Sequence, residues 1–324
     1  MLAIPFSSTA MRGWPTMKSK TRQHARKAEV KRFSPLFDSA FLFLFGRKES
    51  KPITLALLNA VLSGAGLPLV ENVDEIGQIT ADAALPGGIE CRTARCDVVV
   101  VANNAVYDIE SQGLHADIAN KSLFYGSKLI WEHTPKGSEA NGYFNIPQTV
   151  VITLLHDQVL FPHSSQFITV GSLQWEMGMR SEIATDRMIF VVVEMEKIAK
   201  RYNRLDGEIL SDESLAWLYL LARGYSNAGE VEKMAETFLT MEDFATRYGL
   251  AIGDKKLQRA YDKYIEGIME YNTMRYEAHK SGYDEGYEEG KAAGWADGKA
   301  AGWAEGKAEG RAKGEAEGRA EGRA

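Results

Sequence analysis

A valine-rich β-hairpin is the feature that most limits how this chain can fold. Residues 96–101 form a short run rich in β-branched side chains, which favours a strand. Asn103 and Asn104 predict a tight turn, because asparagine tolerates the left-handed backbone conformation that such a turn requires. Residues 106–112 form the returning strand. The segment therefore predicts an antiparallel strand pair.

The register of this hairpin brings acidic residues together. A turn centred on the two asparagines places Val101 opposite Val106. In that register Asp97 falls opposite Glu110, and Gln112 shares their face because side chains two positions apart point the same way. Like charges facing each other repel, and a divalent cation between them would turn that repulsion into binding energy. The hairpin therefore indicates a metal site, although a strand pair whose acids face only water fits the same pattern.

The two faces of the hairpin differ in polarity. One face is apolar throughout and should pack on a core; it consists of Val98, Val100, Tyr107 and Ile109. The face that carries Asp97, Asp108 and Glu110 is therefore expected to point toward solvent or a ligand. This assignment depends on the turn, since a three-residue turn would send Asp97 and Glu110 to opposite faces.

Motifs in and around the hairpin resemble those of a nuclease superfamily. Asp97 followed by Glu110-Ser111-Gln112 is similar to the core of the PD-(D/E)XK nucleases, with Gln112 in place of the usual lysine. Flanking motifs resemble the Rpn-like recombination-promoting nucleases of that superfamily, also described as putative transposases. These motifs span Asp38–Gly46, Leu57–Leu62, Lys121–Leu129 and Phe190–Lys197. The resemblance covers roughly residues 33–200, and more loosely the helices to about residue 275.

The resemblance implies an α/β fold with a restriction-endonuclease-like core, in which helices flank a central mixed sheet. Strand and helix patterns that alternate within one unit point the same way. Four parts are expected along the chain. They are a basic disordered leader at 1–32, a PD-(D/E)XK nuclease-like domain at 33–200, a helical C-terminal region at 201–280 and a glycine-repeat tail at 281–324.

The resemblance also implies a metal-dependent DNA endonuclease that hydrolyses phosphodiester bonds and promotes recombination. Asp97 and Glu110 would bind Mg²⁺ or Mn²⁺, with the carbonyl of Ser111 as a further ligand. Oxygen ligands of this kind suit hard cations.

Other residues would then complete the catalytic set. Gln112 cannot act as a base, but its amide can orient a water molecule. Lys121 or Lys128 would supply the positive charge that the superfamily's lysine provides. For each of these lysines, an ordinary helix lysine whose charged end reaches solvent is an equally good interpretation.

Three further residues have roles implied by the resemblance and ordinary alternatives. Asp38 is a candidate accessory acid, but an acid also suits the start of a helix. Asp108 would tune the site or only face solvent. Tyr125 would contact the substrate backbone or pack against its neighbours.

Charge is spread unevenly along the chain. The net charge of −6, from 38 basic and 44 acidic residues, does not favour non-specific binding to nucleic acid, which depends on neutralising phosphates. Residues 12–32 carry eight lysines and arginines against one acid, Glu29. This leader either attracts a phosphate backbone or is simply disordered.

The cysteines and the hydropathy pattern indicate a cytoplasmic protein. Cys91 and Cys96 are too few for a disulfide framework and are interpreted as ordinary sheet residues in a reducing compartment. The sequence has no run of ~20 apolar residues, so we expect no membrane span.

The tail has a four-residue repeat. From Gly282 to Gly322 a glycine recurs at every fourth position, between residues that favour helices. A stripe of glycines on a helix would let a second copy approach closely, which predicts a homo-oligomer. A solvated, partly helical extension is the alternative.

Besides the nuclease, two further functions stay open. One is a catalytically decayed relative that binds DNA or protein, and the other is an assembly protein driven by the tail.

Overall fold

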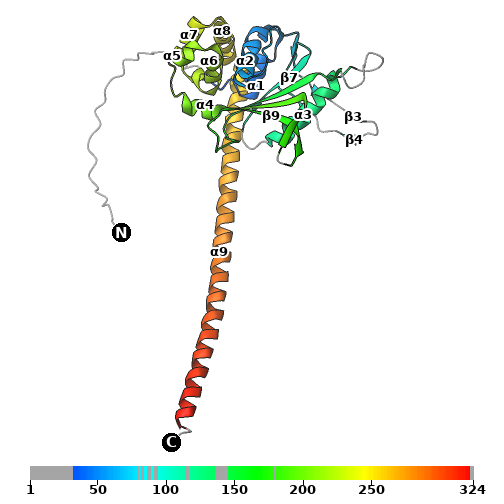
Figure 1. Ribbon diagram of the computed structural model, residues 1–324. Coiled ribbons are helices and arrows are strands. Elements are labelled where there is room, and N and C mark those ends of the chain that lie inside the picture. The colour runs from blue at the N-terminus through cyan, green and yellow to red at the C-terminus, as the bar shows by residue number, and fades with distance from the viewer. Residues whose placement is uncertain are drawn as a thin grey trace, which may run out of the picture. The chain divides into compact units, whose positions relative to one another are not determined.

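The computed structural model describes most of the chain beyond the leader. The described residues are 32–78, 80–81, 84–85, 89–90, 94–113, 117–135, 145–178 and 180–321 (Figure 1). Cys91, Gly322 and all of the predicted leader except Arg32 lie outside them.

A six-stranded mixed sheet forms the centre of the fold, as predicted. Its strand order is β1-β6-β7-β8-β10-β9. The strands are β1 (Glu75–Gly77), β6 (Val98–Ala102), β7 (Ala105–Gln112), β8 (Gln148–Leu155), β9 (Ile168–Met177) and β10 (Arg180–Glu194). β8 runs parallel to both β7 and β10, and the other pairs are antiparallel. Two short ribbons pair β2 (Thr80–Ala81) with β5 (Ala94–Arg95) and β3 (Ala84–Leu85) with β4 (Ile89–Glu90).

The predicted hairpin register is confirmed. Val101 pairs with Val106, and Val99 pairs with Asp108. Asn103 and Asn104 have φ angles of 50° and 58°, the left-handed conformation that the turn requires. β6 begins one residue after Asp97, so the ladder ends just before the acidic pair.

One face of the sheet packs on a large helical core. This core contains α1 (Asp38–Phe45), α2 (Lys51–Gly64), α6 (Glu213–Ala222) and α8 (Leu239–Gly253), which contact one another. Their apolar side chains share one cluster with Val98, Val100, Tyr107 and Ile109, as expected for the apolar face of the hairpin. Around this core lie α4 (Met195–Arg201), α5 (Gly207–Ser211) and α7 (Ala228–Thr237), together with the 3₁₀ turns η1 (Lys48–Ser50) and η4 (Gly224–Ser226).

The other face of the sheet is covered by α3 (Ile118–His133), which contacts β7 and β8. The side chain of Asp117 caps this helix by accepting a hydrogen bond from the backbone N–H of Asn120. Leu129 packs with Cys96, Val99 and Val106 in a second buried cluster. The expectation that this face points toward solvent or a ligand is therefore wrong at Asp108, which is buried because the next helix along the chain folds back across the sheet.

A single helix, α9 (Lys255–Glu321), contains the end of the predicted helical region and the glycine repeat. Its first turns contact α1 and α8, and Tyr264 packs on Phe37 with 5.0 Å between ring centroids. From residue 269 onward every described side chain on this helix is exposed. The helix passes without interruption from the predicted helical region into the glycine repeat, whose expected start was residue 281 (Figure 1). Among the described residues, no helix is both long enough and apolar enough to cross a membrane.

Candidate active site

Six of the predicted site residues line one cavity of about 520 Å³. They are Asp38, Asp97, Glu110, Ser111, Gln112 and Lys121. The cavity lies where the parallel strands β7 and β8 end, and the first turns of α9 form another part of its wall. Polar groups from three separate elements, α1, the hairpin and α3, therefore meet at one opening.

Asp97 and Glu110 hold each other in place through the backbone. The backbone N–H of Asp97 donates to Glu110 Oε1 at 2.9 Å. The backbone N–H of Ser111 donates to Asp97 Oδ2 at 3.0 Å. Each carboxylate is thus fixed by the neighbouring strand, and the two acids face each other as the register predicts.

Both acids are shielded from solvent, which gives their charges large mutual effects. Glu110 is only 2% exposed. Burial, followed by repulsion from Glu110, raises the pKa of Asp97 to about 7. The hydrogen bond from Ser111 opposes this rise, and the charge of Asp38 adds to it. Asp38 is exposed in the first turn of α1, where the helix dipole favours an acid, and it also lines the cavity.

Lys121 joins Glu110 to Gln112. Its Nζ lies 2.9 Å from Glu110 Oε2, and the same ammonium donates a hydrogen bond to Gln112 Oε1. Although burial alone would lower the pKa of Lys121, attraction to Glu110 raises it overall, so the side chain stays charged. The strand position that carries lysine in the superfamily thus holds an amide here, and that amide is in contact with a lysine from α3.

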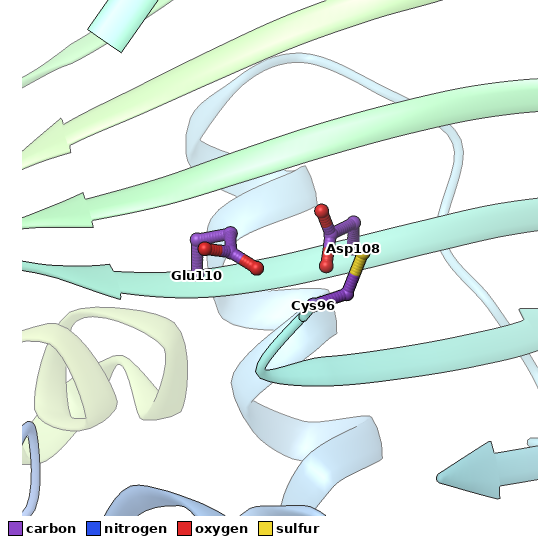
Figure 2. Close-up of side chains that lie close together, drawn as sticks. All are labelled: Cys96, Asp108 and Glu110. Carbon is purple, nitrogen blue, oxygen red and sulfur yellow. The ribbon is translucent and has the colours of Figure 1, made fainter. Parts of the chain in front are cut away.

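Asp108 lies deeper, beneath α3, and is fully buried. Figure 2 shows its carboxyl group near the side chains of Cys96 and Glu110, and one possible ligand atom from each residue lies within 4.8 Å of those of the other two. Among the described residues, Asp108 has no N–H donor for its oxygens, and its polar neighbours are the Cys96 thiol and the Glu110 carboxyl. Burial, with repulsion from Glu110 and Asp97, holds the pKa of Asp108 well above its usual range. Burial thus favours the neutral form of Asp108, and in that form the carboxyl can donate a hydrogen bond to Glu110.

The donor atoms fit a hard divalent cation better than a soft one. Asp97 and Glu110 present carboxylate oxygens at the cavity, and their repulsion favours any cation placed there. Burial raises the pKa of the Cys96 thiol, so this sulfur is a neutral thiol rather than a thiolate. The oxygen-rich rim of the cavity, rather than the buried sulfur, is the place that suits Mg²⁺ or Mn²⁺.

Lys128 and Tyr125 lie further along α3 and do not line the cavity. Lys128 Nζ is 3.8 Å from Glu132 Oε1. Tyr125 is half-buried against the cluster around Val99, and the ammonium of Lys121 lies 5.2 Å from its ring centroid. Their roles in binding substrate or supplying charge stay predictions.

The motif at residues 190–197 supports the chain next to the cavity. Lys197 Nζ lies 2.6 Å from Glu194 Oε2, and Glu194 Oε1 accepts hydrogen bonds from the backbone N–H groups of Leu160 and Phe161. This buried pair fixes the loop that follows β8. Its function is to hold that loop in shape.

The sequence analysis did not identify the cavity wall formed by His156, Asp157 and α9. His156 and Asp157 directly follow β8, and α9 contributes Tyr264 and Tyr271. Polar residues at the carboxyl end of a predicted strand were the available signal, because ligands bind at such ends in α/β sheets. The contribution of α9 has no comparable local signal.

Comparison with protein families gave one match. The model of a family described as PD-(D/E)XK nuclease family transposase matches residues 35–269, which include the hairpin, α3 and the first turns of α9. The comparisons with curated proteins and with solved structures gave no significant match.

Proposed function

Because the chain belongs to the PD-(D/E)XK nuclease family of transposases, we propose that it is a metal-dependent DNA endonuclease that promotes recombination. The observation that carries this proposal is the contact of Lys121 with both Glu110 and Gln112. It supplies a cation next to Gln112, where the superfamily has lysine.

Asp97 and Glu110 would hold the metal, with the carbonyl of Ser111 as a further ligand. Their backbone hydrogen bonds orient them before any cation arrives. A bound Mg²⁺ or Mn²⁺ supplies Lewis acidity at the scissile phosphate.

The neighbouring side chains act on the water and on the developing negative charge. Gln112 is in a position to orient the attacking water through its amide, while Lys121 stabilises charge on the phosphate oxygens. In its neutral form Asp108 would position Glu110 from beneath, and Asp38 would act as an accessory acid at the rim. Tyr125 and Lys128 contact the DNA backbone further along α3.

A DNA-binding relative that no longer cuts is the second candidate, and Gln112 in place of lysine favours it. The retained acidic pair argues against it. Asp97 and Glu110 repel each other in the folded protein, and a chain with no use for a cation gains nothing from keeping that repulsion.

Plasmid cleavage tests the proposal. We expect purified protein to nick or cut plasmid DNA with Mg²⁺ or Mn²⁺ and to stop doing so in EDTA. Asp97→Ala and Glu110→Gln should abolish cutting, whereas Glu182→Gln, on the exposed part of β10, should cut normally. DNA binding without cutting by the native protein would instead support the second candidate.

A further inference from the structure

A histidine–aspartate pair lies in the same cavity as the acidic pair and has no part in the function proposed so far. His156 and Asp157 both line this cavity. The backbone N–H of His156 donates to the carbonyl of Gln112 at 2.9 Å, which places the imidazole directly beside the carboxyl end of β7. A Cβ added at Gly113 would lie 3.1 Å from His156 Cε1, so the ring packs closely over this glycine.

Asp157 fixes the orientation of the ring. His156 Nδ1 donates to Asp157 Oδ2 at 2.8 Å. This hydrogen bond lowers the pKa of Asp157, which is therefore ionised at neutral pH. Asp157 has a φ of 65°, a conformation that aspartate tolerates better than most residues. With Nδ1 engaged in this way, Nε2 is the ring atom left to exchange a proton with a ligand.

Phosphodiester hydrolysis needs a proton for the leaving oxygen, and the other groups around the cavity are poor donors. Lys121 is held by Glu110, and its pKa is raised. Burial raises the pKa of Tyr264 to about 12. Asp97 and Glu110 are assigned to the metal, and an amide such as Gln112 gives up no proton. Imidazole is the side chain that exchanges protons most readily near neutral pH.

We propose that His156 is the general acid that protonates the leaving oxygen, with Asp157 as its positioning residue; this rests on the proposed nuclease function. Water attacks phosphorus, the bond between phosphorus and the leaving oxygen breaks, and the Nε2 proton passes to that oxygen. The proton from the attacking water goes to solvent, from which His156 regains its own proton. Besides Asp157, the charged and titratable groups that line the two cavities bordered by His156 are Asp38 from α1, Lys121 from α3, Tyr225 from η4, Tyr261, Tyr264 and Tyr271 from α9, and the acids Asp97 and Glu110.

The test uses DNA with a bridging sulfur at a cut site mapped for the native protein. A thiolate leaves without needing a proton, so a variant that lacks only the general acid should recover on this substrate. One substrate carries the sulfur on the 3′ side and another on the 5′ side, because either atom can be the leaving group.

We expect His156→Gln to lower kcat on ordinary DNA by roughly 100-fold, the scale of general acid catalysis, while KM changes little. Its rate should return to within about fivefold of the native rate on one of the sulfur substrates. Asp97→Ala should stay inactive on all substrates. Equal losses on oxygen and sulfur would overturn the proposal, since they would mean that His156 only orients the substrate.

Asp157→Asn provides a second variant that leaves the ring in place. Asparagine tolerates the positive φ at this position, and the Asp157 side chain is 52% exposed, so the variant should fold. Because the ring loses the carboxylate that orients it, Asp157→Asn should lower kcat on ordinary DNA and recover on the same sulfur substrate that restores His156→Gln. An unchanged rate on ordinary DNA would contradict the assignment. A native protein that cuts no DNA would refute the nuclease function itself, whereas native-like cutting by His156→Gln would refute only the role of His156.

Discussion

The ammonium of Lys121 lies 2.9 Å from Glu110 Oε2, so α3 provides the cation that the strand position at Gln112 lacks. The Lys121 side chain also lies against the acidic face of the hairpin at the end away from the turn, where it contacts Glu110 and Gln112. Positive charge beside the proposed metal ligands favours phosphate chemistry whichever backbone position supplies it.

The raised pKa of Asp97 makes stability depend on pH in the absence of metal. A carboxyl whose folded-state pKa rises from 3.8 to about 7 binds more protons in the folded protein than in the unfolded chain between these values. The free energy of unfolding should therefore fall as pH rises from about 4 to about 7, by roughly 2 kcal/mol once partial solvent exposure is allowed for.

Urea unfolding in EDTA at pH 5 and pH 8 measures this effect. Asp97→Asn should reduce the difference, while the raised pKa of Asp108 should leave a remainder of the same sign. Mg²⁺ should restore stability at pH 8 in the native protein only. Greater stability of the native protein at pH 8 than at pH 5 in EDTA would show that the acidic pair is not destabilising.

Asp108 should tolerate replacement by its neutral isostere. Because burial raises the folded-state pKa of Asp108, the charge that this side chain carries in the unfolded chain at pH 7 opposes folding, and asparagine does not carry that cost. Asp108→Asn should therefore raise the free energy of unfolding at pH 7 rather than lower it, since the amide can still donate toward Glu110. Chemical denaturation measures the change. A loss of several kcal/mol would mean that Asp108 is ionised and paired in the folded protein.

The exposed part of α9 should be dispensable for cleavage. From residue 269 onward its side chains are exposed, whereas Tyr261 and Tyr264 pack on Phe33 and Phe37. Deleting residues 282–324 should leave the cleavage rate and the midpoint of thermal unfolding nearly unchanged. Deleting residues 255–324 should lower both, because it removes the aromatic contacts and part of the cavity wall.

Light scattering of the shorter deletion also tests the predicted role of the tail. Loss of an oligomer together with retained cleavage would assign self-association to the glycine repeat. Loss of cleavage after the shorter deletion would contradict the view that the tail is an accessory.

The hairpin could be predicted because its determinants are local. Two asparagines specify the turn, and the two-residue period of a strand then places Asp97 against Glu110. The burial of Asp108 could not be predicted in this way, since it results from α3 folding across the sheet. A polar residue on an alternating strand looks the same in sequence whether water or a helix covers it.

The other wall of the cavity depends on pairing and packing between distant segments. The parallel pairing of β8 with β7 is what brings His156 beside Gln112. Tyr264 reaches the cavity because α9 packs on α1. The sequence pattern that predicts α9 as a helix does not indicate which of its turns pack against α1 and α8.

Moving the lysine from the helix to the strand tests the central claim most directly. The measurement is the cleavage rate of Lys121→Met and of the double variant Gln112→Lys/Lys121→Met, with Mg²⁺ and with Lys200→Met on α4 as the control. The account predicts that Lys121→Met loses at least ~100-fold in rate, as expected for the loss of a charge that stabilises the transition state, and that the double variant regains a large part of it. Native-like cutting by Lys121→Met would contradict the account, because the charge that it places beside Glu110 would then have no part in cleavage.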